Sequence, residues 1–284
     1  TKEQFDNSIN YEKNENIIEI MKENLLNSIT KKNVEKINLV EIKKKVVKKL
    51  YLKLLDSCMA KFSDEQIHIL NTEDNTITEL IIKHGCEKIL TINQIQKIGI
   101  NKILQSDLNK LILTRSKDFS QEQVQSIKID KIDFYQYNYI KSYYRSNYIS
   151  IDAIKVLLKN HIKSLTTHQI QSIKINDDSI NAILLYNRIN DLSTSQIEYF
   201  NLESINRYLE QTNFPKNIYQ LLRESHRFND LSRYQLNKII LLNGENAIEI
   251  LHENLLDKID GNRLEIKINE IKEINYEDYL KILQ

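Results

Sequence analysis

Leu165-Thr166-Thr167-His168-Gln169-Ile170-Gln171-Ser172-Ile173 is the most informative stretch of the chain. It places Thr166 after an apolar residue, a Gln three positions further on, and another apolar residue after the Gln. At a helix start, a Ser or Thr hydroxyl accepts a hydrogen bond from the N–H three residues on, and the Gln side chain accepts one from the N–H of the capping residue. The flanking apolar residues pack together over the first turn. The stretch therefore predicts a helix that begins after Thr166.

Five relatives of this sequence, which we call the capping stretch, begin at Phe62, Leu90, Phe119, Leu192 and Leu231. The predicted cap pairs are Ser63 with Gln66, Thr91 with Gln94, Ser120 with Gln123, Thr166 with Gln169, Ser193 with Gln196 and Ser232 with Gln235. Weaker starts near Tyr148 and Phe214 divide the two longest intervals, and another lies near Ile259. A recurrence every roughly 20 to 50 residues is typical of proteins built from stacked repeats.

The composition favours helices. One Pro and four Gly in 284 residues are too few for the tight turns of a β-sandwich or barrel. After the capping stretch comes a break, such as Asn176-Asp177-Asp178-Ser179 or Asn243-Gly244, and then a second segment with helical apolar spacing. We therefore predict an all-α fold, namely a superhelical α-solenoid of short two-helix repeats of about 28 residues.

Two regions are predicted along the chain. Residues 1–61 show no capping stretch, and their apolar spacing predicts an N-terminal helical cap. Residues 62–284 are predicted to form the helical repeat array, with units starting near residues 62, 90, 119, 148, 165, 192, 214, 231 and 259. Gly85 is expected to end one helix and Pro215 to open another. Because the chain starts at Thr1 rather than Met, we expect a fragment of a larger protein.

One alternative is a leucine-rich-repeat-like α/β solenoid, whose repeats have a similar length. The spacing of Ile170, Ile173 and Ile175 fits the apolar core of such a repeat. The position that should hold Asn or Cys is Ile103, Ile132, Asp178, Ile205 and Gly244 in successive copies. Without that side chain the repeat loses its hydrogen-bonded ladder, so helical pairs are favoured.

The opening Leu-Ser/Thr-x-x-Gln-Ile/Val-x-x-Ile resembles the first helix of TAL-effector-type DNA-binding repeats, and the copy at Leu231–Leu256 is the most similar. The resemblance implies a two-residue variable loop that reads one base, on a glycine-rich turn that lets the backbone approach DNA. It covers about nine residues of each copy. Only the copy at Leu231 has a Gly at its break, Gly244, and the copies vary in length, which departs from a regular base-by-base reader.

No catalytic signature is found in the sequence. The four glycines form no phosphate-binding loop, and Gly-x-Ser-x-Gly is absent. His252 lacks a second His four residues on, and His161 with His168 would make only half a metal site. Cys58 and Cys86 are expected to be buried structural thiols. We therefore predict a protein that is not an enzyme and that uses no cofactor and no metal.

The charges balance almost completely. The chain has 40 Lys and Arg against 39 Asp and Glu, so its net charge of +1 gives no global argument for nucleic acid or an anionic membrane. The pairs Asp177-Asp178 and Glu73-Asp74 lie at inferred helix starts, where carboxylates stabilise the helix dipole. No apolar run is long enough to predict a membrane span. The two cysteines indicate a reducing intracellular compartment, the cytoplasm.

Two surface patches stand out. A tyrosine cluster in residues 135–148 provides the candidate partner-binding residues Tyr135, Tyr139, Lys141, Tyr143, Tyr144, Arg145 and Tyr148. Tyr and Arg are enriched at binding hot spots, and both also stack on single-stranded nucleic acid. The second patch is basic and consists of Lys43, Lys44, Lys45, Lys48 and Lys49, whose spacing predicts a basic amphipathic helix.

These features together predict a non-enzymatic scaffold that binds another protein through the curved face of a helical repeat array. A nucleic-acid-binding helical repeat protein is the first alternative, since stacked tyrosines and basic residues suit either ligand. A regulatory or recognition arm of an enzyme that lies outside this fragment is the second.

Overall fold

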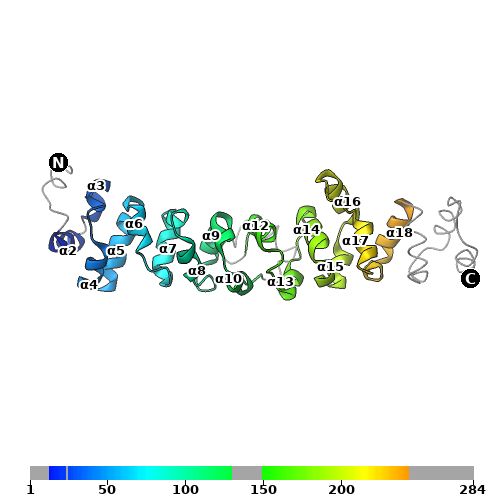
Figure 1. Ribbon diagram of the computed structural model, residues 1–284, viewed down its shortest axis with the longest axis horizontal. Helices are drawn as coiled ribbons and strands as arrows, with labels where there is room; N and C mark the ends of the chain where they lie inside the picture. The colour runs from blue at the N-terminus through cyan, green and yellow to red at the C-terminus, as the bar shows by residue number, and fades with distance from the viewer. Residues whose placement is uncertain (1–12, 24, 130–148, 243–284) are drawn as a thin grey trace, which may run out of the picture. The chain divides into compact units, whose positions relative to one another are not determined.

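The computed structural model describes residues 13–23, 25–129 and 149–242, and these are helical with connecting turns (Figure 1). No strand occurs among them, so the all-α prediction is confirmed for this part of the chain. The leucine-rich-repeat alternative needs a strand in each repeat. It is wrong for the described copies. At residues 170–175, where the repeat would need a strand, the chain forms the end of a helix and then an irregular connection.

The chain divides into two compact units, which we call the first and second lobes. The described part of the first lobe comprises residues 13–23, 25–128 and 149–164, and that of the second lobe comprises residue 129 and residues 165–242. The predicted boundary between a cap and an array at residue 61 does not coincide with this division and stays a prediction.

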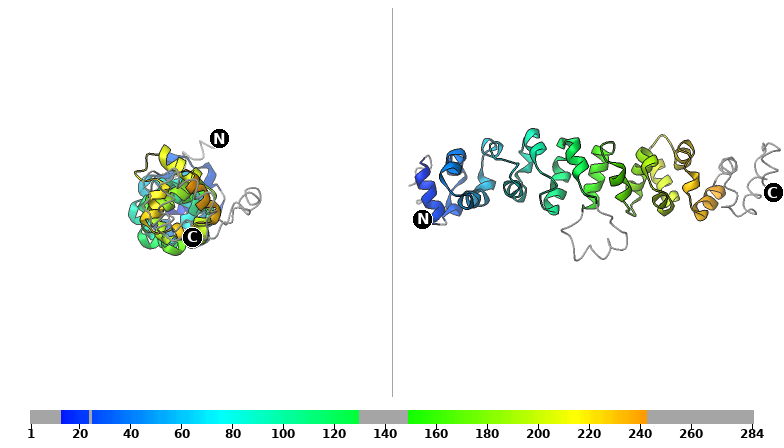
Figure 2. Two further views of the ribbon diagram at one scale, coloured as in Figure 1. Left: turned by 90° about the vertical axis from the view of Figure 1, so that its right-hand side faces the viewer. Right: turned by 90° about the horizontal axis from the view of Figure 1, so that it is seen from below.

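Short and longer helices alternate in the first lobe. Its helices are α2 (Asn14–Lys22), η1 (Leu26–Ser28), α3 (Lys31–Val34), α4 (Leu39–Lys45), α5 (Lys48–Cys58), η2 (Met59–Lys61), α6 (Asp64–His68), α7 (Asn75–Lys83), η3 (Cys86–Lys88), α8 (Ile92–Lys97), α9 (Gln105–Arg115), η4 (Ser116–Asp118), α10 (Gln121–Ser126) and α12 (Ile151–His161). The longer helices pack in chain order, since α5 contacts α7, α7 contacts α9, and α9 contacts α12 (Figure 2).

The second lobe follows the same alternation with one addition. Its helices are α13 (Thr167–Ser172), α14 (Asp178–Arg188), η5 (Ile189–Asp191), α15 (Thr194–Tyr199), α16 (Leu202–Gln211), α17 (Ile218–Glu224), η6 (Phe228–Asp230) and α18 (Arg233–Leu242). Helix α17 is the addition, and it packs against both α14 and α16.

The predicted reciprocal caps are present at every capping stretch. Full capping boxes open α6, α8, α10, α13 and α15, and Ser232 with Gln235 exchanges the same two hydrogen bonds at α18. At α10, for example, the Ser120 N–H donates to Gln123 Oε1 at 3.0 Å, and the Gln123 N–H donates to Ser120 Oγ at 3.2 Å. The local pattern therefore sets where each of these short helices begins.

Five of these glutamines also contact the preceding copy: Gln66, Gln94, Gln123, Gln196 and Gln235. The Nε2 of Gln123 donates to the carbonyls of Ile95 and Ile98 at 2.9 Å each, at the end of α8. In the second lobe, Gln235 Nε2 donates to the carbonyls of Ile197 and Phe200 at 2.8 Å each. These glutamines are buried. Because the last carbonyls of a helix have no partner within it, each glutamine caps its own helix and also satisfies the end of the previous short helix.

Residues 29–37 contain a stretch related to the capping stretch, with Asn33 at the position that Gln occupies in the six copies. Thr30 is the N-cap residue of α3, and Asn33 is buried at the position of the glutamines. The carbonyls of Val34 and Ile37 accept from Gln66 Nε2 at 3.0 and 2.9 Å. The ends of α6, α8, α13 and α15 receive the same kind of contact, so the pattern extends toward the N-terminus.

The weak start near Phe214 differs from the prediction in detail. Pro215 does not open a helix, because α17 begins at Ile218. Asn217 is the N-cap residue and forms a capping box with Gln220, so this segment has a cap where none was predicted. Gly85 does adopt the left-handed conformation expected after a helix, with φ +77°.

Candidate binding groove in the second lobe

The predicted tyrosine cluster lies outside the described residues, as do all seven of its candidate binding residues: Tyr135, Tyr139, Lys141, Tyr143, Tyr144, Arg145 and Tyr148. Its role stays a prediction. The described part of the second lobe contains a different surface of similar chemistry. This is a groove with a volume of about 270 Å³, formed where the end of α15 meets α16, α17 and α18.

Three tyrosines from three helices line the groove: Tyr199 of α15, Tyr219 of α17 and Tyr234 of α18. Tyr199 and Tyr234 are 48% and 68% exposed. Tyr219 is half-buried, and its burial, followed by the nearby carboxylates of Glu203 and Glu210, raises the pKa of its hydroxyl. The groove therefore presents aromatic surface to solvent at a site with negative charge.

The additional helix α17 is what supplies the third tyrosine. The backbone turns before and after it at Asn213 and His226, which adopt left-handed conformations with φ 55° and 54°. Phe214 packs against Tyr186 with ring centroids 4.6 Å apart, and the Ile218 N–H donates to Asn206 Oδ1 at 3.2 Å. These contacts hold α17 against α14 and α16, so that Tyr219 reaches the groove.

Lys238 is the basic residue of the groove lining. Its Nζ lies 5.2 Å from the centroid of the Tyr234 ring and 3.4 Å from Glu203 Oε2. The hydrogen bond with Tyr234, together with the Glu203 carboxylate, raises the pKa of the Lys238 ammonium. The other carboxylate oxygen of Glu203 lies 3.4 Å from Arg207 Nη2. The site thus already holds one cation between an aromatic face and a carboxylate.

The predicted basic patch has a different geometry from that expected. Helix α4 ends at Lys45 and α5 begins at Lys48, with Val46 and Val47 extended between them, so the prediction of one continuous basic helix is wrong. Three of its five lysines have acidic partners: Lys44 with Glu41, Lys45 with Glu15 and Lys48 with Asp74, at 3.0, 3.3 and 2.7 Å. Lys43 and Lys49 are exposed at the same junction. Pairing therefore neutralises most of the patch.

Three capping stretches are preceded by an Arg–Asp ion pair that we call an arginine clasp, which was not predicted from the sequence. Arg115 pairs with Asp118 at 2.7 Å and Arg188 with Asp191 at 2.6 Å, and Arg227 pairs with Asp230. Each guanidinium also donates to backbone carbonyls 23 to 38 residues earlier, as from Arg227 Nη1 to the Ile189 carbonyl at 2.7 Å. The signal in the sequence is Arg-x-x-Asp directly before the capping stretch. Its contacts indicate a structural role.

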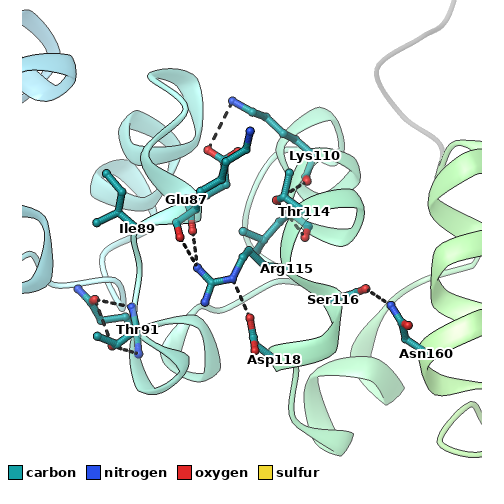
Figure 3. A network of polar contacts seen from close by, with 12 residues as sticks. Glu87, Ile89, Thr91, Lys110, Thr114, Arg115, Ser116, Asp118 and Asn160 are labelled. Atoms are coloured by element: carbon teal, nitrogen blue, oxygen red, sulfur yellow. Dashed lines mark hydrogen bonds and ion pairs between the residues drawn. The ribbon is translucent and has the colours of Figure 1, made fainter. Parts of the chain in front are cut away.

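A buried carboxylate lies beside one of these clasps, as Figure 3 shows. The Glu87 side chain has no exposed surface, and neither of its oxygens has a hydrogen-bond partner. Its charge is balanced by Lys110, whose Nζ lies 3.6 Å from Glu87 Oε2, within ion-pair range but beyond hydrogen-bond range. Arg115 donates to the Glu87 backbone carbonyl at 2.7 Å and thereby joins this pair to its clasp (Figure 3).

The remaining candidates for chemistry have structural roles. Cys58 and Cys86 are buried free thiols; burial raises the pKa of Cys58 to about 11, and burial followed by Glu87 raises that of Cys86. His161 Nε2 lies 2.6 Å from the Ser116 carbonyl. Asp74 and Asp177 cap α7 and α14, as their positions predicted.

The described residues contain no group of three or more His, Cys, Asp or Glu side chains arranged to hold a metal ion. None of their helices has the length and apolar character that a membrane crossing requires. Comparison of the chain with protein-family models, with curated proteins and with solved structures gave no match.

Proposed function

We propose that this chain is a non-enzymatic scaffold, an α-solenoid of short two-helix repeats that binds another protein. The groove of Tyr199, Tyr219 and Tyr234 is the observation that supports the binding role most directly. Tyrosine buries a large area at low entropic cost, which is why it is enriched among the residues that dominate binding energy. Two exposed tyrosines in one groove of a helical surface are best explained by a partner that covers them.

The recurring contact between successive copies supports the solenoid. Gln66, Gln94 and Gln123 in the first lobe, and Gln196 and Gln235 in the second, each join their own helix to the end of the previous short helix. Short helices of five or six residues are not stable alone. Such contacts repeated along a chain are what a nearest-neighbour repeat protein requires.

Solution scattering tests the architecture. A compact globule of 284 residues has a radius of gyration of about 19 Å. A solenoid should exceed this value and give a pair-distance distribution with a long tail. A radius close to the compact value, with a symmetric distribution from a monomer, would contradict the proposed architecture.

Site-specific photo-crosslinking tests the binding role. Benzoylphenylalanine at position 234 should crosslink to a discrete polypeptide in an extract, whereas the same group at Leu113, an exposed residue of α9, should not. The double variant Tyr199→Ala and Tyr234→Ala should lose that partner while its melting temperature changes little, because both rings are exposed. Equal labelling from positions 113 and 234 would contradict a binding role for the groove.

Nucleic acid is the alternative ligand, and the salt dependence of binding distinguishes it. Phosphate contacts release counterions, so the affinity for a labelled single-stranded oligonucleotide would fall steeply between about 50 and 200 mM salt. The pairing of Lys44, Lys45 and Lys48 with carboxylates favours the protein partner. An enzyme that uses this chain as its recognition arm would appear among the crosslinked polypeptides.

A further inference from the structure

We propose that the tyrosine groove recognises a basic side chain, Arg or Lys, on a segment of the protein partner, and that Lys238 occupies this position in the free chain. The inference rests on the proposed protein-binding function and names the chemistry that the groove selects. It follows from the position of Lys238, from the charge of the lining and from the aromatic surface around it.

The position of Lys238 shows that the groove accommodates a cation. Its ammonium lies against the Tyr234 ring, 5.2 Å from the centroid, and 3.4 Å from Glu203 Oε2. An aromatic face and a carboxylate together attract a cation more strongly when solvent is excluded. Lys238 is exposed, so solvent screens its own interactions with the groove. A partner side chain that covered the groove would make the same contacts with less water present.

The charges of the lining favour a basic occupant over an acidic one. Glu198 and Glu203 contribute two carboxylates, and Lys238 contributes one ammonium. An acidic segment would be repelled by both carboxylates, whereas a basic side chain that took the place of Lys238 would pair with Glu203 as Lys238 does. Outside the lining, Arg207 pairs with the other oxygen of Glu203 and fixes the carboxylate without filling the groove.

The tyrosines make Arg the preferred occupant. A guanidinium is planar, stacks on aromatic rings and donates two parallel hydrogen bonds to a carboxylate. Tyr199, Tyr219 and Tyr234 come from three helices and all belong to the groove lining. An ammonium such as that of Lys238 is a more strongly hydrated point charge, so an incoming Arg should displace it.

The test uses fluorescein-labelled Gly-Ser-Leu-Arg-Leu-Ser-Gly and the same peptide with citrulline, a neutral isostere, in place of Arg. Fluorescence anisotropy with the full chain should show at least about fivefold tighter binding of the Arg peptide. Lys238→Met removes the internal competitor and should tighten binding of the Arg peptide severalfold. Tyr234→Ala and Glu203→Gln should weaken it. Lys159→Met, on an exposed position of α12, is the matched control and should change nothing.

The inference is overturned if wild type binds neither peptide, if it binds both equally, or if Lys238→Met weakens binding of the Arg peptide. Melting curves of each variant show that the fold is retained, which is expected because Tyr234 and Lys238 are exposed. Failure of the wider proposal has a different signature. A partner crosslinked at position 234 without preference for Arg refutes only the basic-side-chain inference, while the absence of any specific crosslink refutes the binding role.

Discussion

At the scale of single residues, the choice of Gln over Glu in the capping stretch has a physical reason. Either side chain can accept the hydrogen bond from the capping residue's N–H. Only Gln can also donate, and the Nε2 groups of Gln94, Gln123, Gln196 and Gln235 each donate to two or more carbonyls of the previous copy. A buried carboxylate at the same position would face those carbonyls with like polarity. The hydrogen bonds to the previous copy therefore require Gln rather than Glu at this position.

We expect Gln123→Glu to lower the free energy of unfolding by about 2–4 kcal/mol at pH 7, because it leaves two buried carbonyls without donors and buries a charge. Urea denaturation measures the change. Gln220→Glu is the matched control, since Gln220 forms a capping box but is exposed. It should change stability by less than about 0.5 kcal/mol. Similar effects of the two substitutions would show that the contact across copies contributes nothing.

At the scale of elements, side-chain bonds at both ends explain how helices as short as α6 and α8 persist. The six residues of α8 are capped at the start by Thr91 and at the end by Gln123, whose Nε2 donates a hydrogen bond to the Ile95 carbonyl. The arginine clasps fix the 3-10 turn that leads into the next capping stretch, as Arg188 and Asp191 do before α15. Helix α8 thus has hydrogen-bond partners in the copies on either side of it, Thr72 before it and Gln123 after it.

The clasp before α15 should make stability sensitive to acid. The hydrogen bond from Arg188, followed by that from Thr167, lowers the pKa of Asp191. A carboxylate with a lowered folded-state pKa contributes stability above its unfolded pKa, about 3.9, and that contribution is lost as the pH falls through the folded value. Asp191→Asn should therefore be less stable than wild type near neutral pH, and the difference should shrink below about pH 4. A difference that is constant from pH 7 to pH 3 would show that the charge of Asp191 is irrelevant.

At the scale of the whole molecule, the cores of the two lobes are built from equivalent positions of the capping stretch. The apolar residue after each glutamine is fully buried in both lobes, as Ile67, Ile95 and Val124 in the first and Ile170, Ile197 and Leu236 in the second. Most polar cross-contacts join positions about one copy apart, so each copy is stabilised mainly by its neighbours. In the proposed solenoid, a partner would bind a surface that no single copy provides.

Thiol labelling reports the integrity of the first lobe. Cys58 and Cys86 are buried there, and their raised pKa values keep both sulfurs protonated at neutral pH. We expect neither thiol to react with Ellman's reagent at pH 7 in the native protein, and both to react after denaturation in urea. Rapid reaction of either thiol without denaturant would show that the core around it opens readily.

The sequence by itself determined the helical class, the starts of the short helices and the caps of α7 and α14, because these depend on hydrogen bonds between residues two or three positions apart. The break between α4 and α5, the Asn33 variant and the cap at Asn217 departed from the simplest pattern. Only the tertiary structure revealed the second role of the glutamines, the carbonyl partners of the arginines and the tyrosine groove. Their atoms come from segments tens of residues apart, as Gln235 and Ile197 do, and no local pattern records which distant segments packing brings together.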